Sequence, residues 1–297
     1  MKTIYYFLLF CCLVFAVSCN TASVEPAAEE PESEEPAAEE PVTSCEPIQP
    51  AWDGKRPNDS YQYPVLPGME EWGDLKSGQE MYDACQVPKD ILENMSTQAI
   101  IQAILEHPQS FEIFVYSDCY QVYFERFWWE FNNHAYVELT ERKDAAPALL
   151  DRLILTYPLT GIFSKPEFES QLLEILFSQT FFLSQLNDCE KKNVVEFALK
   201  NDDLRHTDDD FAKDSDYGLF IGKITASLLI GRTLIAAGYV PFVDAMDASE
   251  DLKGFIEGWQ QGTLNPNTGK PYAFIYPSHP HIPPQIIDFG NEYLTSK

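Results

Sequence analysis

The sequence predicts a mainly α-helical domain, built as a multi-helix bundle or an irregular helical array, with an irregular N-terminal strap and a C-terminal arm. Apolar residues recur at spacings of three and four along most of residues 79–261, and helix start signals precede several runs. No pair of alternating strands joined by Asn-Gly or Asp-Gly is evident. Antiparallel helices joined by short loops fit this pattern. A helical-repeat solenoid is the alternative, although no period between roughly 30 and 45 residues aligns matching positions.

The first expected element is the strap over residues 51–76, where proline, glycine, aspartate and aromatic residues are typical of irregular chain. Ser96 then begins a helix with an apolar stripe that includes Ile100 and Ile104, and this helix ends before Pro108. Ser164-Lys165-Pro166-Glu167 is a capping box with proline just inside the helix start. The same spacing predicts helices at Gln79–Gln86, Phe111–Tyr116, Tyr120–Phe131, Ala145–Thr156, Asn193–Lys200, Leu219–Gly238 and Ser249–Gln261.

The most apolar segment after the N-terminus, Leu219–Gly238, is predicted to be the central buried helix. Lys223 and Arg232 interrupt it, and two cations near its middle would be costly in lipid. Its glycines allow neighbouring helices to approach closely. Further on, Asn-Pro, Thr-Gly and Pro-Pro pairs predict an extended arm over Asn265–Pro284.

Residues 1–18 are predicted to be a lipoprotein signal peptide. Lys2 precedes an uncharged apolar run, Ile4–Val17, which is too short for a permanent membrane span. The run ends at Ala16-Val17-Ser18-Cys19, which resembles a lipobox with alanine in place of the usual leucine. We expect cleavage before Cys19 and acyl chains such as palmitate on this cysteine, which anchor the protein to a membrane. The alternative is an ordinary signal peptide cleaved nearby.

Asn20 follows the lipidated cysteine, in place of an aspartate that would retain a lipoprotein in the inner membrane. This residue favours the outer membrane and leaves the leaflet open. Residues 19–50 are predicted to be the lipidated cysteine and a disordered Glu/Pro/Ala tether, because residues 20–44 hold eight glutamates, regularly spaced prolines and no base. Residues 51–297 are the expected helical domain.

The folded part of the chain is strongly acidic by itself. Of 47 acidic and 20 basic residues, 39 and 19 remain from residue 45 onward, which leaves a net charge of −20. No local basic cluster interrupts this charge. The composition therefore argues against nucleic acid as a partner.

Four further cysteines lie beyond Cys19: Cys45, Cys85, Cys119 and Cys189. Export through an oxidising space permits a disulfide, and four thiols allow three complete pairings among which the sequence does not choose. No CxxC pair is present, and Cys85 and Cys119 are expected to be small buried apolar residues.

No cofactor and no catalytic residue is assigned, because the chain has no GxSxG, HExxH, P-loop or GxGxxG pattern. The acidic stretch Asn201–Asp216 offers oxygen ligands for calcium. However, the EF-hand positions for glycine and glutamate hold Lys213 and Leu219. A solvated acidic loop between helices is the favoured interpretation.

The histidines do not form a metal-binding pattern. His279 and His281 flank a proline that constrains them, and no third ligand is specified. His107, His134 and His206 are isolated, and we expect them to make structural hydrogen bonds.

Trp128 and Trp129 are the candidate binding residues. With Phe124, Phe127 and Phe131 they form a cluster that core packing explains in large part, but it is dense enough to cover more than one helix face. An exposed tryptophan can stack on a sugar ring or anchor a protein partner. The sequence favours a non-enzymatic protein- or glycan-binding module, and the alternative is a secreted metal-assisted hydrolase.

Short motifs in the first half of the folded region point to one protein family. Tyr63-Pro64-Val65-Leu66-Pro67-Gly68 is followed by Glu71-Trp72, by Ala84-Cys85-Gln86-Val87-Pro88 and by Met95-Ser96-Thr97. Together they resemble the opening of an uncharacterised family of secreted bacterial all-helical proteins, over about residues 61–155. The resemblance implies a helical fold and export, and it assigns no functional residue.

Replacing Cys19 with serine should release the protein from the membrane fraction, because the acyl chains that anchor it are attached to this sulfur. Fractionation of cells that express the wild-type and Cys19→Ser chains measures this. A variant that still sediments with membranes would contradict lipidation at Cys19.

Overall fold

The computed structural model describes Cys45, residues 48–110, Phe124, and residues 132–157, 165–207, 216–257 and 281–296, all within the compact unit Ser44–Lys297. The domain is mainly α-helical, as the sequence predicts, and no strand occurs among the described residues. The helices are α1 (Glu70–Asp74), α2 (Gly78–Ala84), α3 (Lys89–Leu92), α4 (Thr97–Leu105), α7 (His134–Glu141), α8 (Ala145–Leu155), α9 (Lys165–Phe177), α10 (Thr180–Leu183), α11 (Asp188–Thr207), α13 (Asp216–Ala236), α14 (Val240–Ala248), α15 (Glu250–Glu257) and α16 (Ile282–Thr295).

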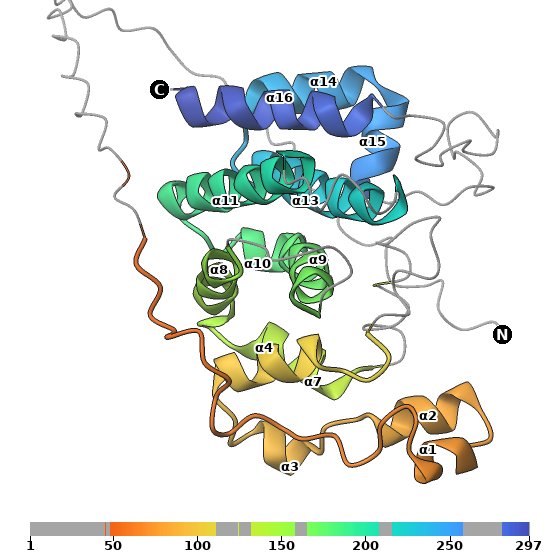
Figure 1. The fold of residues 1–297 in the computed structure, drawn as a ribbon. Coiled ribbons are helices and arrows are strands. Elements are labelled where there is room, and N and C mark those ends of the chain that lie inside the picture. Colours follow the sequence, from red (N-terminus) through yellow and green to blue (C-terminus); the bar gives the residue numbers. More distant parts are fainter. Residues whose placement is uncertain are drawn as a thin grey trace, which may run out of the picture. The chain divides into compact units, whose positions relative to one another are not determined.

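Helices that follow one another in the sequence stack in space (Figure 1). α4 contacts α7 and α8, α8 contacts α9, and α9 contacts α13. α11 and α13 pack along each other, and α16 lies against both. This arrangement is an irregular helical array, in which each layer buries its apolar face on the next.

Several predicted helices are confirmed, with small shifts at their ends. Ser96 caps α4 by accepting a hydrogen bond from the backbone N–H of Ala99 at 3.2 Å. The helices expected at Ala145–Thr156 and after the Ser164–Glu167 capping box are α8 and α9. The expected helices Phe111–Tyr116 and Tyr120–Phe131 lie outside the described residues, except for Phe124, which is helical and buried.

The acidic stretch Asn201–Asp216 is not a solvated loop at its start, which corrects the sequence prediction. Residues 201–207 continue α11, and Asn201, Asp202 and Arg205 are buried. The expected helix Asn193–Lys200 is therefore the middle of a helix of 20 residues. The sequence prediction failed here because the partners of these polar side chains come from another helix.

The C-terminal arm predicted over Asn265–Pro284 is wrong at its end. Ile282, Pro283 and Pro284 form the first turn of α16, while residues 258–280 lie outside the described residues. Proline is compatible with this position because the first N–H groups of a helix have no intrahelical partner. Pro241 has the same role at the start of α14, another helix that the sequence did not predict.

α13 is the central buried helix expected from Leu219–Gly238, with its residues 224–230 buried. At Gly231 an added Cβ would collide with Ile256 of α15 and lie 3.2 Å from Phe242 of α14. Glycine therefore permits the close approach of these helices. Gly238 ends this region with a φ of +63°, a conformation that favours glycine.

No single described helix has the length and apolar character needed to span a membrane. Ile224–Ala236 and Val240–Ala248 meet that test only when taken together, and the chain bends by 112° between them.

The strap is fastened to the helices at several points. A Cys45–Cys189 disulfide joins the segment just before the strap to α11, with Cα atoms 5.3 Å apart. The carboxylate of Asp151 in α8 accepts hydrogen bonds from the backbone N–H groups of Ala51 at 2.9 Å and Trp52 at 3.1 Å. Cys45 thus lies within the compact unit Ser44–Lys297. Cys119 lies outside the described residues.

Further along, Tyr63 of the strap is buried, and its hydroxyl donates to the carbonyl of Ala103 in α4 at 2.9 Å. Asp59 accepts hydrogen bonds from both the backbone N–H and the hydroxyl of Ser96. Cys85, at the end of α2, is fully buried, as the sequence predicts. The strap thus behaves as part of the core and not as a loose surface segment.

A network of buried ions joins α9, α11 and α13. The guanidinium of Arg205 lies 2.9 Å from Glu167 Oε1 and 3.1 Å from Glu174 Oε1, and all three side chains are at most 4% exposed. Thr225 of α13 donates its hydroxyl proton to Glu174, and Asn201 donates its amide to the same carboxylate at 3.3 Å. The network therefore ties three helices together through one cation and two carboxylates.

Burial raises the pKa of Glu174 above its usual value, and the charge of Arg205 and the hydrogen bond from Thr225 oppose this rise. Burial alone would lower the pKa of Arg205, but Glu174 and Glu167 outweigh it and the pKa is raised. The guanidinium therefore stays charged, and its removal would leave two carboxylates without their counterion in the core.

Replacing Arg205 with methionine should lower the free energy of unfolding by about 3 kcal/mol or more, because it breaks a buried ion pair from one side. Lys200→Met on the same helix is the matched control. Its ion pair with Glu196 is exposed at 40% and 47%, so the expected loss is below about 1 kcal/mol. Urea denaturation of the purified chain measures both, and equal losses would contradict the role of the network.

Candidate functional site

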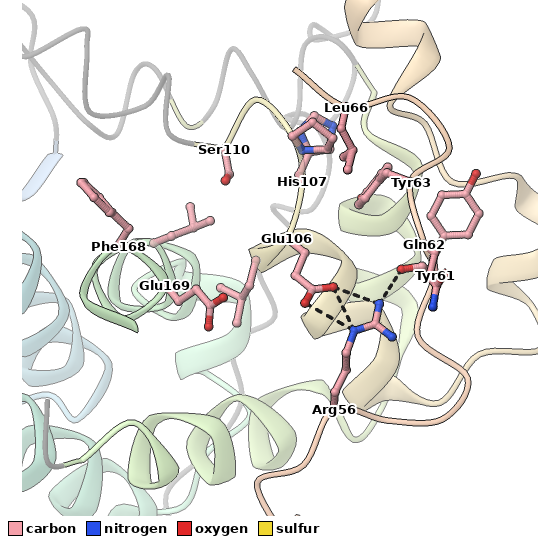
Figure 2. Close-up of a pocket in the computed structure, with 13 residues that line it drawn as sticks. Arg56, Tyr61, Gln62, Tyr63, Leu66, Glu106, His107, Ser110, Phe168 and Glu169 are labelled. Carbon is pink, nitrogen blue, oxygen red and sulfur yellow. Dashed lines mark hydrogen bonds and ion pairs between the residues drawn. The ribbon is translucent and has the colours of Figure 1, made fainter. Parts of the chain in front are cut away.

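A cavity of about 820 Å³ lies between the strap, the end of α4 and one face of α9. In Figure 2, Phe168 and Glu169 of α9 lie on one side, with Tyr63 and His107 across from them. Its lining consists of Arg56, Tyr61, Gln62, Tyr63, Leu66, Leu105, Glu106, His107, Pro108, Ser110, Phe168, Glu169 and Leu172. A volume of this size falls within the range of about 300–1,000 Å³ that is typical of small-molecule sites.

The strap and the end of α4 are held together in this wall by an ion pair. Arg56 Nη2 lies 3.0 Å from Glu106 Oε2, and the same nitrogen donates to the carbonyl of Tyr61 at 2.9 Å (Figure 2). The side chains are 39% and 19% exposed. The guanidinium thus fixes the path of the strap beside the cavity.

His107 lies at the back of the cavity and is almost fully buried. The backbone N–H of Gln109 donates to its Nδ1 at 3.2 Å, so the proton of the neutral ring is on Nε2. Burial lowers the pKa of His107 to about 3. Its ring also meets Tyr63 edge to face, with centroids 5.6 Å apart. His107 is therefore an uncharged part of the wall at neutral pH.

The opposite wall is formed by α9. Phe168 and Leu172 are one helical turn apart and contribute apolar surface. Glu169 forms an ion pair with Arg152 of α8 at 3.2 Å, and both side chains are 13% exposed. The guanidinium of Arg152 also stacks over Trp52 of the strap at 5.2 Å. The two walls are thus connected through α8.

The buried ionic network sets the rotation of α9 about its axis. Glu167 and Glu174 are seven residues apart, lie on one face of the helix and point to Arg205. Phe168 and Leu172 are on a different face, which borders the cavity. The interaction that stabilises the core therefore also directs these two side chains into the cavity.

The site residues that the sequence predicts fall outside the part of the chain that the structure describes. Cys19, Trp128 and Trp129 lie outside the described residues, as do residues 208–215 and His279. His281 is exposed just before α16. Within the described ranges, no group of three or more His, Cys, Asp or Glu side chains is placed to hold a metal ion.

Of the isolated histidines, His134 has the structural role that was expected. Its backbone N–H donates to the side chain of Gln86 at 2.9 Å, and its Nδ1 lies 3.1 Å from the carbonyl of Val87. The side chain of His206 is outside the described set. The cavity residues were missed because they are ordinary strap and helix residues. The one available signal was the density of aromatic and proline residues in residues 61–67.

Replacing His107 with glutamine should reduce the dependence of stability on pH below 6.5. The imidazole of the unfolded chain binds a proton near pH 6.5, whereas the buried imidazole binds one only near pH 3. The contribution of His107 to the free energy of unfolding is therefore fully present above pH 6.5 and is lost as the pH falls. Between pH 6.5 and 4 the wild type should lose about 3 kcal/mol more than His107→Gln. Urea denaturation over this pH range checks it, and parallel curves would contradict the burial of His107.

In comparisons with family models, curated proteins and solved structures, no significant match to the chain was found. The resemblance of residues 61–155 to secreted helical proteins therefore stays a prediction.

Proposed function

We propose that this protein is a lipoprotein anchored through Cys19 to the cell outer membrane, and that its helical domain is a non-enzymatic binding module. The cavity between the strap and α9 is the proposed ligand site. The observation that carries the proposal is this cavity of about 820 Å³, walled by aromatic, apolar and ion-paired side chains. Pockets of that kind are the usual places where folded domains bind small ligands.

The disulfide supports the exported location. Cys45 and Cys189 are 144 residues apart in sequence and pair in the folded domain. Disulfides persist in oxidising compartments and are rare in the reducing cytosol. A domain that contains such a disulfide at the end of an acidic tether suits the outside of a membrane.

The chemistry of the cavity favours binding over catalysis. His107 has a pKa of about 3, far from the operating pH at which an imidazole is an efficient general base. The carboxylates of Glu106 and Glu169 are each engaged by an arginine. The arrangement of these groups stabilises the wall of the cavity and does not suit proton transfer.

Replacing Leu66 with tryptophan should block the site. Leu66 lines the cavity and is 38% exposed, so a larger side chain can fill the cavity without disturbing the core. Ile91→Trp, at a similarly exposed position of α3 outside the cavity, is the control. The detergent-solubilised chain is screened on a glycan array and on a peptide array. We expect each ligand found there to bind roughly tenfold more weakly to Leu66→Trp. The affinity of the same ligands for Ile91→Trp should not change.

Binding that is the same in both variants, or no binding on either array, would contradict the cavity as the ligand site. Turnover of a bound ligand together with stoichiometric metal in the purified protein would favour the metal-assisted hydrolase instead.

A further inference from the structure

Among the described residues, the charged side chains at the cavity are paired with oppositely charged partners. Arg56 pairs with Glu106 and Arg152 with Glu169, so two cations face two anions at distances of 3.0 and 3.2 Å. Both pairs are partly buried, and His107 adds no charge at neutral pH. A charged ligand would have to be desolvated without a counterion or displace one of these pairs. The lining therefore favours a ligand without net charge, although the domain as a whole is acidic.

The strap adds polar groups that are available to a ligand. Among the residues that the structure describes, none receives a hydrogen bond from Arg56 Nη1, and none forms one with the side chain of Tyr61 or Gln62. An amide both donates and accepts, a phenol does the same, and a guanidinium donates. Three neighbouring groups of this mixed character suit a ligand that carries several hydroxyls.

Much of the remaining lining is apolar, and it contains aromatic rings. Leu66 is 38% exposed, and Phe168 lies on the opposite side of the cavity from Tyr63 (Figure 2). An aromatic face is suited to the C–H face of a sugar ring, while the polar edge of the same sugar contacts hydrogen-bonding groups. The cavity thus offers an apolar wall and a polar wall to one ligand.

From these features we infer that the cavity binds a short, uncharged saccharide, with its rings against Phe168 and its hydroxyls toward Arg56 and Gln62. This inference rests on the proposed function, because it names the ligand class of the same site. According to this inference, the cavity binds a neutral saccharide more tightly than a charged saccharide or a peptide.

The test uses isothermal titration calorimetry of the detergent-solubilised full chain. The probes are three neutral trisaccharides, maltotriose, cellotriose and N,N′,N″-triacetylchitotriose, and two charged ones, trigalacturonate and triglucosamine. We expect at least one neutral trisaccharide to bind and both charged ones to bind roughly tenfold or more weakly. Phe168→Ala should weaken that binding roughly tenfold, and Gln62→Ala about threefold or more.

Two matched controls separate the site from general effects on folding. Phe181→Ala and Gln185→Ala replace exposed residues of the same types outside the cavity, and neither should change binding. Gln62 is exposed, so its variant remains informative if Phe168→Ala destabilises the domain.

Stronger binding of a charged trisaccharide, or no binding of any neutral one, would overturn this inference. If peptides alone bind and Leu66→Trp abolishes that binding, the saccharide inference fails while the binding module stands. If neither saccharides nor peptides bind, both fail.

Discussion

The buried guanidinium of Arg205 is the interaction on which the positions of α9, α11 and α13 depend. It neutralises carboxylates that would otherwise be costly in the core, and it can do so only while Glu167 and Glu174 stay on the inner face of α9. A helix held in this rotation presents Phe168 and Leu172 to the cavity. The geometry of the candidate site thus depends on a charged cluster that is not part of its lining.

The second constraint is the fastening of the strap. A disulfide at Cys45, the carboxylate of Asp151 and the buried ring of Trp52 hold its first part, and Tyr63 holds the part that borders the cavity. These contacts remove the freedom of a segment with no regular structure of its own. They allow an irregular segment to form a defined wall of the cavity. In the sequence, this segment is at the N-terminal end of the domain, next to the proposed tether.

The sequence predicted those features that depend on local pattern. Apolar spacing located α4 and α13, and capping residues located the start of α9. It did not predict that residues 201–207 are helical and partly buried, because the carboxylates that pair with Arg205 are about 30 to 40 residues away. The cavity was missed for the same reason, since Phe168 faces the strap across the cavity only when α8 and α9 are packed together.

The central claim is that the cavity between the strap and α9 is the ligand site. Hydrogen–deuterium exchange of the full chain, with and without a neutral trisaccharide at a saturating concentration, tests it most directly. The account predicts slower amide exchange in residues 56–66, in residues 105–110 and at the start of α9, where the bound ligand would hold both walls. No change in these segments, or protection confined to α14, α15 and α16, would contradict it.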